Sequence, residues 1–231
     1  MARLLVHVEG QTEETFVNEV LRIHLVARGY DSVSARLVGN ARLRQGRGGI
    51  RSWPTVRTGI LNHLRDDQDC IATTMIDYYG LPNHGPGAWP GRARSAGLRS
   101  TEEKARFVQE AVRNDLATGL GARFNSGRFV PFVVMHEFEG LLFSDCAAFS
   151  HSIGRSDLEI AFRKIREQFA TPEDINDSAD TAPSKRVQAL AERYQKPLNG
   201  VRAVLEIGLS RIQEECPHFD NWLTHLEILA R

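Results

Sequence analysis

The chain is poor in cysteine and has no long apolar run. Its three cysteines, Cys70, Cys146 and Cys216, lie far apart and form no CxxC pair. This spacing argues against a disulfide framework or a zinc site and favours three reduced, buried thiols. No run of about 18 apolar residues occurs, so we expect no transmembrane helix. The first apolar run is too short for a signal peptide and ends at Glu9, so we expect a cytoplasmic protein without a membrane partner.

Net charge is also absent, because 29 Lys and Arg residues balance 29 Asp and Glu residues. Global charge therefore gives no indication of a nucleic-acid partner. Locally, acids are missing between Asp31 and Asp66 and between Asp77 and Glu102. The first of these stretches carries seven arginines: Arg36, Arg42, Arg44, Arg47, Arg51, Arg57 and Arg65. Guanidinium groups suit phosphates, although a GC-rich genome would also favour arginine over lysine.

Hydrophobic periodicity predicts strands that alternate with helices. Short apolar or β-branched runs predict strands over residues 3–8, 33–38, 70–76 and 129–135. Helical patterns begin near Thr12, Pro54 and Ser100, and they dominate the chain after residue 156. This order predicts an α/β fold with a Rossmann-like, mostly parallel sheet flanked by helices. We place one domain over residues 1–150 and a helical C-terminal region, packed on it, over residues 151–231.

Acidic residues follow three of the four predicted strands. Glu9 follows the first strand, Asp77 the third, and Glu137 and Glu139 the fourth. Because the carboxyl ends of parallel strands meet at one edge of a sheet, we expect these carboxylates to converge. Clustered carboxylates repel one another, and a hard cation such as Mg²⁺ or Mn²⁺ would neutralise them. The alternative is that each acid simply favours the start of a helix.

Neighbouring residues have two interpretations each. His136 is a candidate general acid or metal ligand, or else a hydrogen-bonded structural residue. Tyr78 and Tyr79 could stack on a base or hold a phosphate, or pack into the core. The arginine-rich stretch around Arg42 to Arg57 could grip a phosphate backbone, or form a loop without a ligand.

Six segments, spread in order over most of the chain, resemble one known family. They are residues 8–13 (Val-Glu-Gly-Gln-Thr-Glu), 75–82 (Met-Ile-Asp-Tyr-Tyr-Gly-Leu-Pro), 136–143 (His-Glu-Phe-Glu-Gly-Leu-Leu-Phe), 183–186 (Pro-Ser-Lys-Arg), 194–196 (Tyr-Gln-Lys) and 216–219 (Cys-Pro-His-Phe). They resemble domain-of-unknown-function family 4276, a bacterial TOPRIM-like family related to old-type nucleases. The resemblance implies a TOPRIM-like fold, in which a glutamate and a glycine end the first strand and an Asp-x-Asp pair ends a later one.

The resemblance also implies a metal site. Glu9, Asp77 and either Glu137 or Glu139 would ligate one or two Mg²⁺ or Mn²⁺ ions, and Glu13 would be an outer-shell or second-metal ligand. This chain departs from the TOPRIM pattern, because Asp77 is followed by two tyrosines and the second acid of Asp-x-Asp is missing. Glu137 or Glu139 would have to supply the lost ligand.

The function implied is that of a metal-dependent nuclease acting on DNA or RNA. Its nucleic-acid contacts would come from seven basic residues: Arg42, Arg44, Arg47, Arg51, Lys185, Arg186 and Lys196. The last three could instead belong to a solvated helix face. Family members are often encoded beside an AAA-type ATPase, which implies such a partner and a role in phage defence. The chain has no GxxxxGK[ST] run, so any ATP dependence would come from that partner. The alternatives are a non-catalytic partner of the ATPase and a small-molecule phosphohydrolase.

Overall fold

The computed structural model describes residues 2–38, 52–122, 124–175 and 181–230. The chain divides into two compact units, of which the first combines Met1–Val133 with His225–Arg231 and the second comprises Val134–Thr224. The first division therefore falls at residue 133, whereas the sequence suggested one near residue 150. The final residues of the chain return to the first unit.

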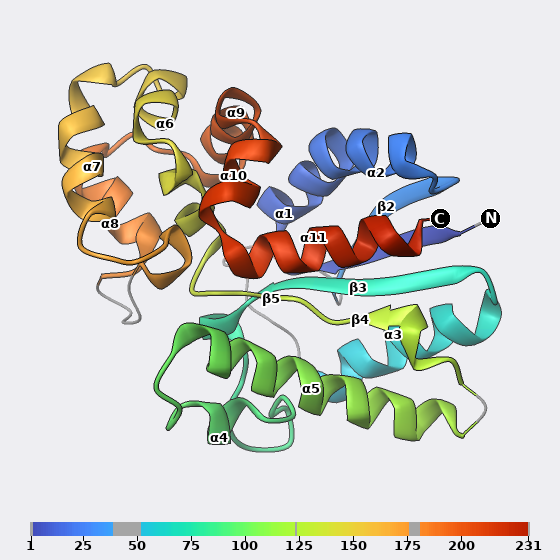
Figure 1. Cartoon of the computed structure of the whole chain (residues 1–231). Coiled ribbons are helices and arrows are strands. Elements are labelled where there is room, and N and C mark those ends of the chain that lie inside the picture. Colours follow the sequence, from blue (N-terminus) through green and yellow to red (C-terminus); the bar gives the residue numbers. More distant parts are fainter. Residues whose placement is uncertain (1, 39–51, 123, 176–180, 231) are drawn as a thin grey trace. The chain divides into compact units, whose positions relative to one another are not determined.

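A parallel sheet forms the middle of the first unit (Figure 1). Its strands lie in the order β2 (Ser32–Leu37), β1 (Arg3–Val8), β3 (Cys70–Asp77) and β4 (Phe129–Val130). All the pairings along this order are parallel. Strand β3 is buried along nearly its whole length, which explains why its sequence is continuously apolar or β-branched. The predicted α/β fold with a mostly parallel sheet is confirmed.

Helices cover both faces of this sheet (Figure 1). They are α1 (Gln11–Phe16), the π-helical turn η1 (Val17–Leu21), α2 (Arg22–Arg28), α3 (Trp53–Asp66), the 3₁₀ turn η3 (Tyr78–Gly80), α4 (Arg92–Ser95), α5 (Thr101–Leu120) and the 3₁₀ turn η4 (Ser126–Arg128). Helices α3 and α5 lie on one face, and α1 and α2 lie on the other. The first helical stretch is thus continuous from α1 to α2, with one wider turn in its middle.

The helix ends follow local sequence signals. Glu103 N–H donates to Ser100 Oγ at 3.1 Å, and Ser100 N–H donates to Glu103 Oε2 at 3.2 Å, so a capping box starts α5 at the predicted position. Pro54 lies in the first turn of α3, where its missing N–H has no cost. Gly29 ends α2 with a φ of 127°, a left-handed backbone that favours glycine.

The returning C-terminal residues pack beside α2. The hydroxyl of Tyr30 donates to the carbonyl of Leu226 at 2.9 Å. The carboxylate of Glu227 lies 2.6 Å from His24 Nε2 and 3.3 Å from Arg28 Nη1. These contacts make the last residues of the chain part of the first unit.

The predicted strand over residues 129–135 is wrong in one respect, because it is broken into β4 and the short β5 (Val133–Val134). Pro131 lies at the break and has no N–H for a strand ladder. At Phe132 the side chain of Thr74 replaces the ladder. Its hydroxyl donates to the carbonyl of Phe132 at 2.8 Å and accepts from the N–H of Phe132 at 2.9 Å.

The second unit is helical. It contains the 3₁₀ segments η5 (Phe138–Ser144), η6 (Ser156–Leu158) and η7 (Pro172–Asp174), the helices α6 (Cys146–Ser152), α7 (Glu159–Arg166), α8 (Pro183–Leu190), α9 (Lys196–Ile207) and α10 (Leu209–Glu215), and most of α11 (Pro217–Leu229). Its core includes Phe149 stacked on Phe162 with ring centroids 4.7 Å apart, and Phe143 edge-on to both rings. The expected helical C-terminal region is confirmed.

A buried carboxylate caps the last helix of this unit. Glu173, from η7, accepts the N–H of His218 at 2.8 Å and the N–H of Phe219 at 2.9 Å. These N–H groups belong to the first turn of α11, which has no intrahelical acceptors for them. Burial nevertheless raises the pKa of Glu173 to about 7. The cap therefore holds a carboxyl group that ionises near neutral pH.

The state of the three cysteines agrees with the expectation from the sequence. Cys70, Cys146 and Cys216 are free and buried. Burial raises the pKa of the Cys146 thiol to about 11, which makes it a poor nucleophile. Across the described ranges, no helix is long and apolar enough to cross a membrane.

Candidate functional site

Glu9 and Asp77 stand at the carboxyl ends of the two central strands of the first unit. Val8, the last residue of β1, is in register with Met75 of β3. Glu9 therefore comes level with Ile76, and Asp77 is one residue further along. With strands about 4.8 Å apart and a rise of about 3.3 Å per residue, their Cα atoms are about 6 Å apart. Both residues are half-buried at this rim of the sheet.

Gly10 and Glu13 shape the turn that follows Glu9. Glu13 Oε2 accepts the N–H of Gly10 at 3.0 Å, and the Glu13 residue is buried. A Cβ atom at Gly10 would lie 3.2 Å from the same oxygen, so the glycine leaves room for this contact. Glu13 thus has a structural task at the start of α1, and its role as a metal ligand stays a prediction.

Tyr78, directly after Asp77, is a packing residue. Its hydroxyl lies 2.8 Å from Ser95 Oγ, and its ring lies 3.9 Å beneath the guanidinium carbon of Arg92. Arg92 Nε also donates to the carbonyl of Tyr78 at 3.1 Å. Of the two interpretations for Tyr78, core packing is confirmed. Arg92 is buried by these contacts, so this arginine has a structural role.

The other acidic pair, Glu137 and Glu139, belongs to the second unit. Lys196 Nζ lies 3.6 Å from Glu137 Oε1 and 3.2 Å from Glu139 Oε2. The N–H of Ser184, in the first turn of α8, donates to Glu137 Oε2 at 3.0 Å. Lys196 therefore has two carboxylate partners, and its predicted contact with nucleic acid stays a prediction.

Glu139 is the most deeply buried acid of this pair, with 1% of its surface exposed. Burial, and then the charge of Glu137, raise its pKa to about 7 against the opposing effect of Lys196. Its Oε1 atom makes no hydrogen bond within the described residues. The same holds for the hydroxyl of Tyr194, whose pKa is raised by burial and then by Glu139 and Glu137. Two carboxylates, one ammonium and one phenol therefore form a partly buried polar cluster.

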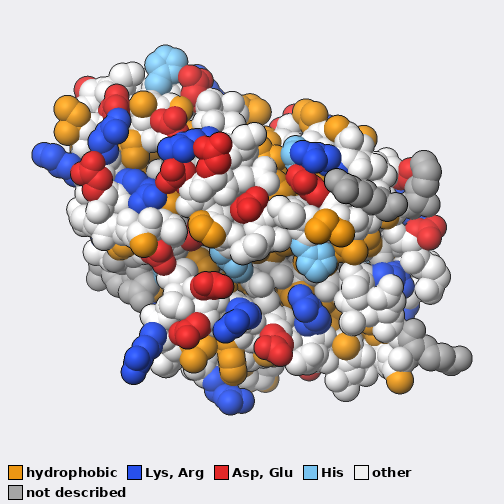
Figure 2. Space-filling model, viewed as in Figure 1, with side chains coloured by type: hydrophobic (Ala, Val, Ile, Leu, Met, Phe, Trp, Pro, Cys, Tyr) orange, Lys and Arg blue, Asp and Glu red, His pale blue; other side chains and the backbone are white. Residues whose placement is uncertain are grey.

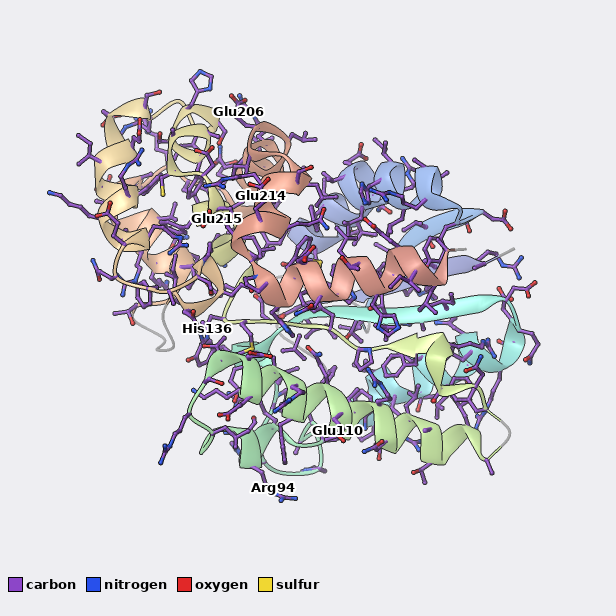
Figure 3. All side chains as sticks on the ribbon, viewed as in Figure 1. Arg94, Glu110, His136, Glu206, Glu214 and Glu215 are labelled. Carbon is purple, nitrogen blue, oxygen red and sulfur yellow. The ribbon has the colours of Figure 1, made fainter. Side chains whose placement is uncertain are left out.

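His136 begins the segment that carries the two glutamates. It is buried and has a φ of 63°, in the left-handed region that non-glycine residues rarely occupy. Figure 3 labels it on the connection that leads into η5. A strained backbone at such a position is typical of functional sites, where the surrounding structure holds the strain. Its role as a general acid or metal ligand stays a prediction.

The remaining predicted nucleic-acid residues have separate outcomes. Arg42, Arg44, Arg47 and Arg51 lie outside the described residues. Lys185 is exposed on α8. Arg186 Nε donates to the carbonyl of Thr181 at 2.9 Å, and its guanidinium lies over the Phe169 ring at 5.4 Å. Among the described members of this set, only Lys185 presents its charge fully to solvent.

Several other basic side chains of the second unit are paired with acids. Arg166 Nη2 lies 2.9 Å from Glu215 Oε2, and Arg211 Nη2 lies 2.8 Å from Glu215 Oε1. Arg163 is paired with Glu159 at 2.6 Å. Figure 2 shows blue and red side chains interleaved over α7 and α10, and Figure 3 labels Glu215 there. This surface is therefore mixed in sign, unlike a phosphate-binding patch.

Sequence reasoning missed the part played by Tyr194 and Ser184 around the glutamates. Both lie in segments that resemble the family, but a tyrosine and a backbone N–H carry no charge signal. In the part of the chain that the structure describes, no group of three or more His, Cys, Asp and Glu residues is arranged to hold a metal ion. The convergence of Glu9 and Asp77 with Glu137 and Glu139 stays a prediction.

Comparison with known proteins gives one family. A family model described as Domain of unknown function (DUF4276) matches residues 8–227, nearly the whole chain. No curated protein and no solved structure matches the chain.

Proposed function

The chain belongs to the DUF4276 family, and we propose that it is a TOPRIM-like nuclease that hydrolyses phosphodiesters with Mg²⁺ or Mn²⁺. One observation carries this proposal. The register of β1 and β3 brings Glu9 and Asp77 to adjacent strand ends at the same rim of the sheet. In open α/β sheets the ligand site lies at the carboxyl ends of the strands, where these acids stand.

Two carboxylates suit Mg²⁺, which commonly binds one or two protein carboxylates and keeps water and substrate phosphate as its other ligands. The donor atoms at this rim are hard oxygens, which favour Mg²⁺ or Mn²⁺ over softer metals. Such an ion supplies a Lewis acid for the phosphoryl group and lowers the pKa of a bound water. Glu9 and Asp77 would hold the ion, while Glu13 keeps the turn after β1 in place.

Glu137, Glu139 and His136 are proposed as further catalytic residues, and Glu137 or Glu139 as a further ligand. Lys196 now neutralises part of the charge of both glutamates. A phosphate group would compete for this ammonium and leave the glutamates to a cation or a proton. The proposed substrate is DNA or RNA, and the proposed setting is the effector of an ATPase-linked bacterial defence system in the cytoplasm.

The second candidate is a non-catalytic binding or regulatory partner of an AAA-type ATPase. Two observations favour it. Tyr79 occupies the position of the second acid in Asp-x-Asp, and Glu139 already has a lysine ammonium as its partner. In that case the acidic residues would stabilise the fold only.

Metal binding separates the two candidates. Mn²⁺ should raise the midpoint temperature of wild-type unfolding, and Asp77→Asn should remove most of that rise because one of two ligands loses its charge. Asp66→Asn is the matched control, since Asp66 is exposed at the end of α3. Cleavage of labelled single- and double-stranded DNA and RNA should then require Mg²⁺ or Mn²⁺ and Asp77. A wild-type protein that shows neither the thermal rise nor cleavage supports the non-catalytic candidate.

A further inference from the structure

The second unit contains a pocket of about 540 Å³ next to the polar cluster around Glu139. It is lined by Ile153, Arg155, Ala189, Leu190, Ala191, Glu192, Arg193, Tyr194 and Asn199. These residues come from the segment after α6, from the end of α8 and the turn that follows it, and from the first turns of α9. The volume falls in the range of about 300–1,000 Å³ that is typical of small-ligand sites.

Tyr194 connects this pocket to the two glutamates. It lines the pocket, and only 7% of its surface is exposed. Its hydroxyl makes no hydrogen bond within the described residues, and the charges of Glu139 and Glu137 reach it. Lys196, two residues further on, contacts both of these glutamates. The short segment from Tyr194 to Lys196 therefore separates the pocket from the acidic pair.

The polar groups of the pocket differ in whether they are already occupied. Arg155 is bound to Asp157 through two contacts of 2.7 and 2.6 Å. Arg193 is exposed and makes no ion pair within the described residues. Asn199 Oδ1 accepts the N–H of Gln195 at 2.7 Å, which fixes its orientation and leaves the two amide hydrogens as donors. The pocket thus offers one guanidinium and one amide donor group.

Glu192 adds an exposed carboxylate to the lining, and apart from Tyr194 the remaining side chains are apolar. Ile153, Leu190 and Ala191 contribute aliphatic surface, and Ala189 adds a small side chain at the exposed edge. A flat ring can rest against such a surface, with its polar edge on the amide of Asn199. A phosphate attached to that ring through a sugar could reach the guanidinium of Arg193, which binds phosphate with two parallel hydrogen bonds.

We propose that this pocket binds a single nucleotide, with its phosphate on Arg193 and its base against Leu190 and Ala191. The proposal rests on the proposed phosphodiesterase function and deepens it. It places a nucleotide of the substrate beside Glu137 and Glu139, with Tyr194 between them. The pocket would recognise a base and a phosphate in one molecule. A free phosphate ion has no base and so lacks half of these contacts.

The test is the binding of nucleoside 5′-monophosphates, in both ribose and deoxyribose forms. Calorimetry or NMR measures this binding in the presence of EDTA. Wild type should bind at least one of them, and inorganic phosphate should bind at least tenfold more weakly (1.4 kcal/mol) because it has no base. Arg193→Ala and Ala189→Trp should each weaken nucleotide binding about tenfold or more. Both positions are exposed, so both variants should fold.

Two variants outside the pocket serve as matched controls. Arg202→Ala removes another exposed arginine, on α9, and Ile160→Trp adds an indole at an exposed position of α7. Neither should change binding. The proposal is overturned if wild type binds no nucleotide, if phosphate binds as tightly as the nucleotides, or if the controls weaken binding as much as the pocket variants.

The binding test is independent of the metal, so its failure is distinguishable from failure of the proposed function. Metal-dependent cleavage without nucleotide binding in EDTA would overturn the pocket alone. Nucleotide binding that depends on Arg193, in a protein without metal-dependent cleavage, would overturn the nuclease and leave the pocket as a nucleotide sensor.

Discussion

The ammonium of Lys196 lies 3.2 Å from a carboxylate oxygen of Glu139, a side chain with 1% of its surface exposed. The same ammonium lies 3.6 Å from Glu137. One cation therefore faces two carboxylates, and the deeper carboxylate has a pKa raised to about 7. This arrangement places the charge balance of the Glu137 and Glu139 pair on a single lysine.

Lys196→Met should destabilise the protein, because it leaves two neighbouring carboxylates without their cation. Breaking a fully buried pair costs about 3–5 kcal/mol. Lys196 is 38% exposed, so we expect a smaller loss of about 1–3 kcal/mol in the free energy of unfolding at pH 8. Urea unfolding measures this loss. Lys164→Met, at an exposed position of α7, should leave the stability unchanged.

A compensating change sharpens this test. Glu139→Gln removes the buried charge, so the double variant Glu139→Gln with Lys196→Met should recover most of the stability lost in Lys196→Met alone. An equal loss in the double variant would show that the lysine stabilises the fold through its aliphatic chain and not through its charge.

Glu173 should make stability fall as pH rises toward neutrality. Its pKa is about 7 in the folded protein, whereas an ordinary glutamate has a pKa of 4.5. The folded state therefore binds the proton more tightly than the unfolded state. The resulting stabilisation is complete below about pH 4.5 and is lost between about pH 4.5 and 7. It amounts to at most about 3 kcal/mol. The measurement is the free energy of unfolding in urea across this interval.

Glu173→Gln is neutral at every pH, so it should reduce the decline of stability between pH 4.5 and 7. The raised pKa of Glu139 acts in the same direction, whereas the lowered pKa of the buried His7 makes stability rise with pH, so the contribution of Glu173 is read from the difference between the wild-type and Glu173→Gln profiles. Glu167→Gln, at an exposed position, is the control and should keep the full decline. An unchanged decline in Glu173→Gln would contradict the assignment.

Two glycine substitutions should have opposite signs. Gly29 has a φ of 127°, and a Cβ atom there would lie 2.6 Å from the carbonyl oxygen of Ala230, so Gly29→Ala should cost about 1–3 kcal/mol. Gly59 lies inside α3 with nothing within 4 Å of a Cβ atom, so Gly59→Ala should stabilise by about 0.5–1 kcal/mol. Thermal and urea unfolding of both variants check the pair. A loss at Gly59 as large as at Gly29 would show that backbone conformation is not the cause.

Much of the first unit could be predicted because its signals are local. Parallel strands that are buried on both faces have apolar sequences, and Ser100, Pro54 and Gly29 mark helix ends through backbone chemistry. The break at Pro131 could not be placed from the sequence alone. The break depends on the hydroxyl of Thr74, which is far away in the chain. This hydroxyl bonds the backbone of Phe132 in place of a neighbouring strand.

The candidate site was predictable only in part. The acids at strand ends could be predicted, because apolar and β-branched runs show where each strand ends. The partners of Glu139 are not, since Lys196 and Tyr194 come from a later segment and reach it through tertiary packing. A lysine in the sequence does not reveal whether its partner is a phosphate or a glutamate, so the ion pairs of Lys196 could not be predicted.

The return of the final residues to the first unit has a practical consequence for dissecting the protein. A fragment that ends at residue 133 would leave the phenol of Tyr30 without the carbonyl of Leu226 and would expose the surface that those residues cover. His24 and Arg28 would lose Glu227 in the same cut. A single truncation at residue 133 therefore removes part of the first unit. Studying it in isolation calls for a designed linker that joins residue 133 to residue 225.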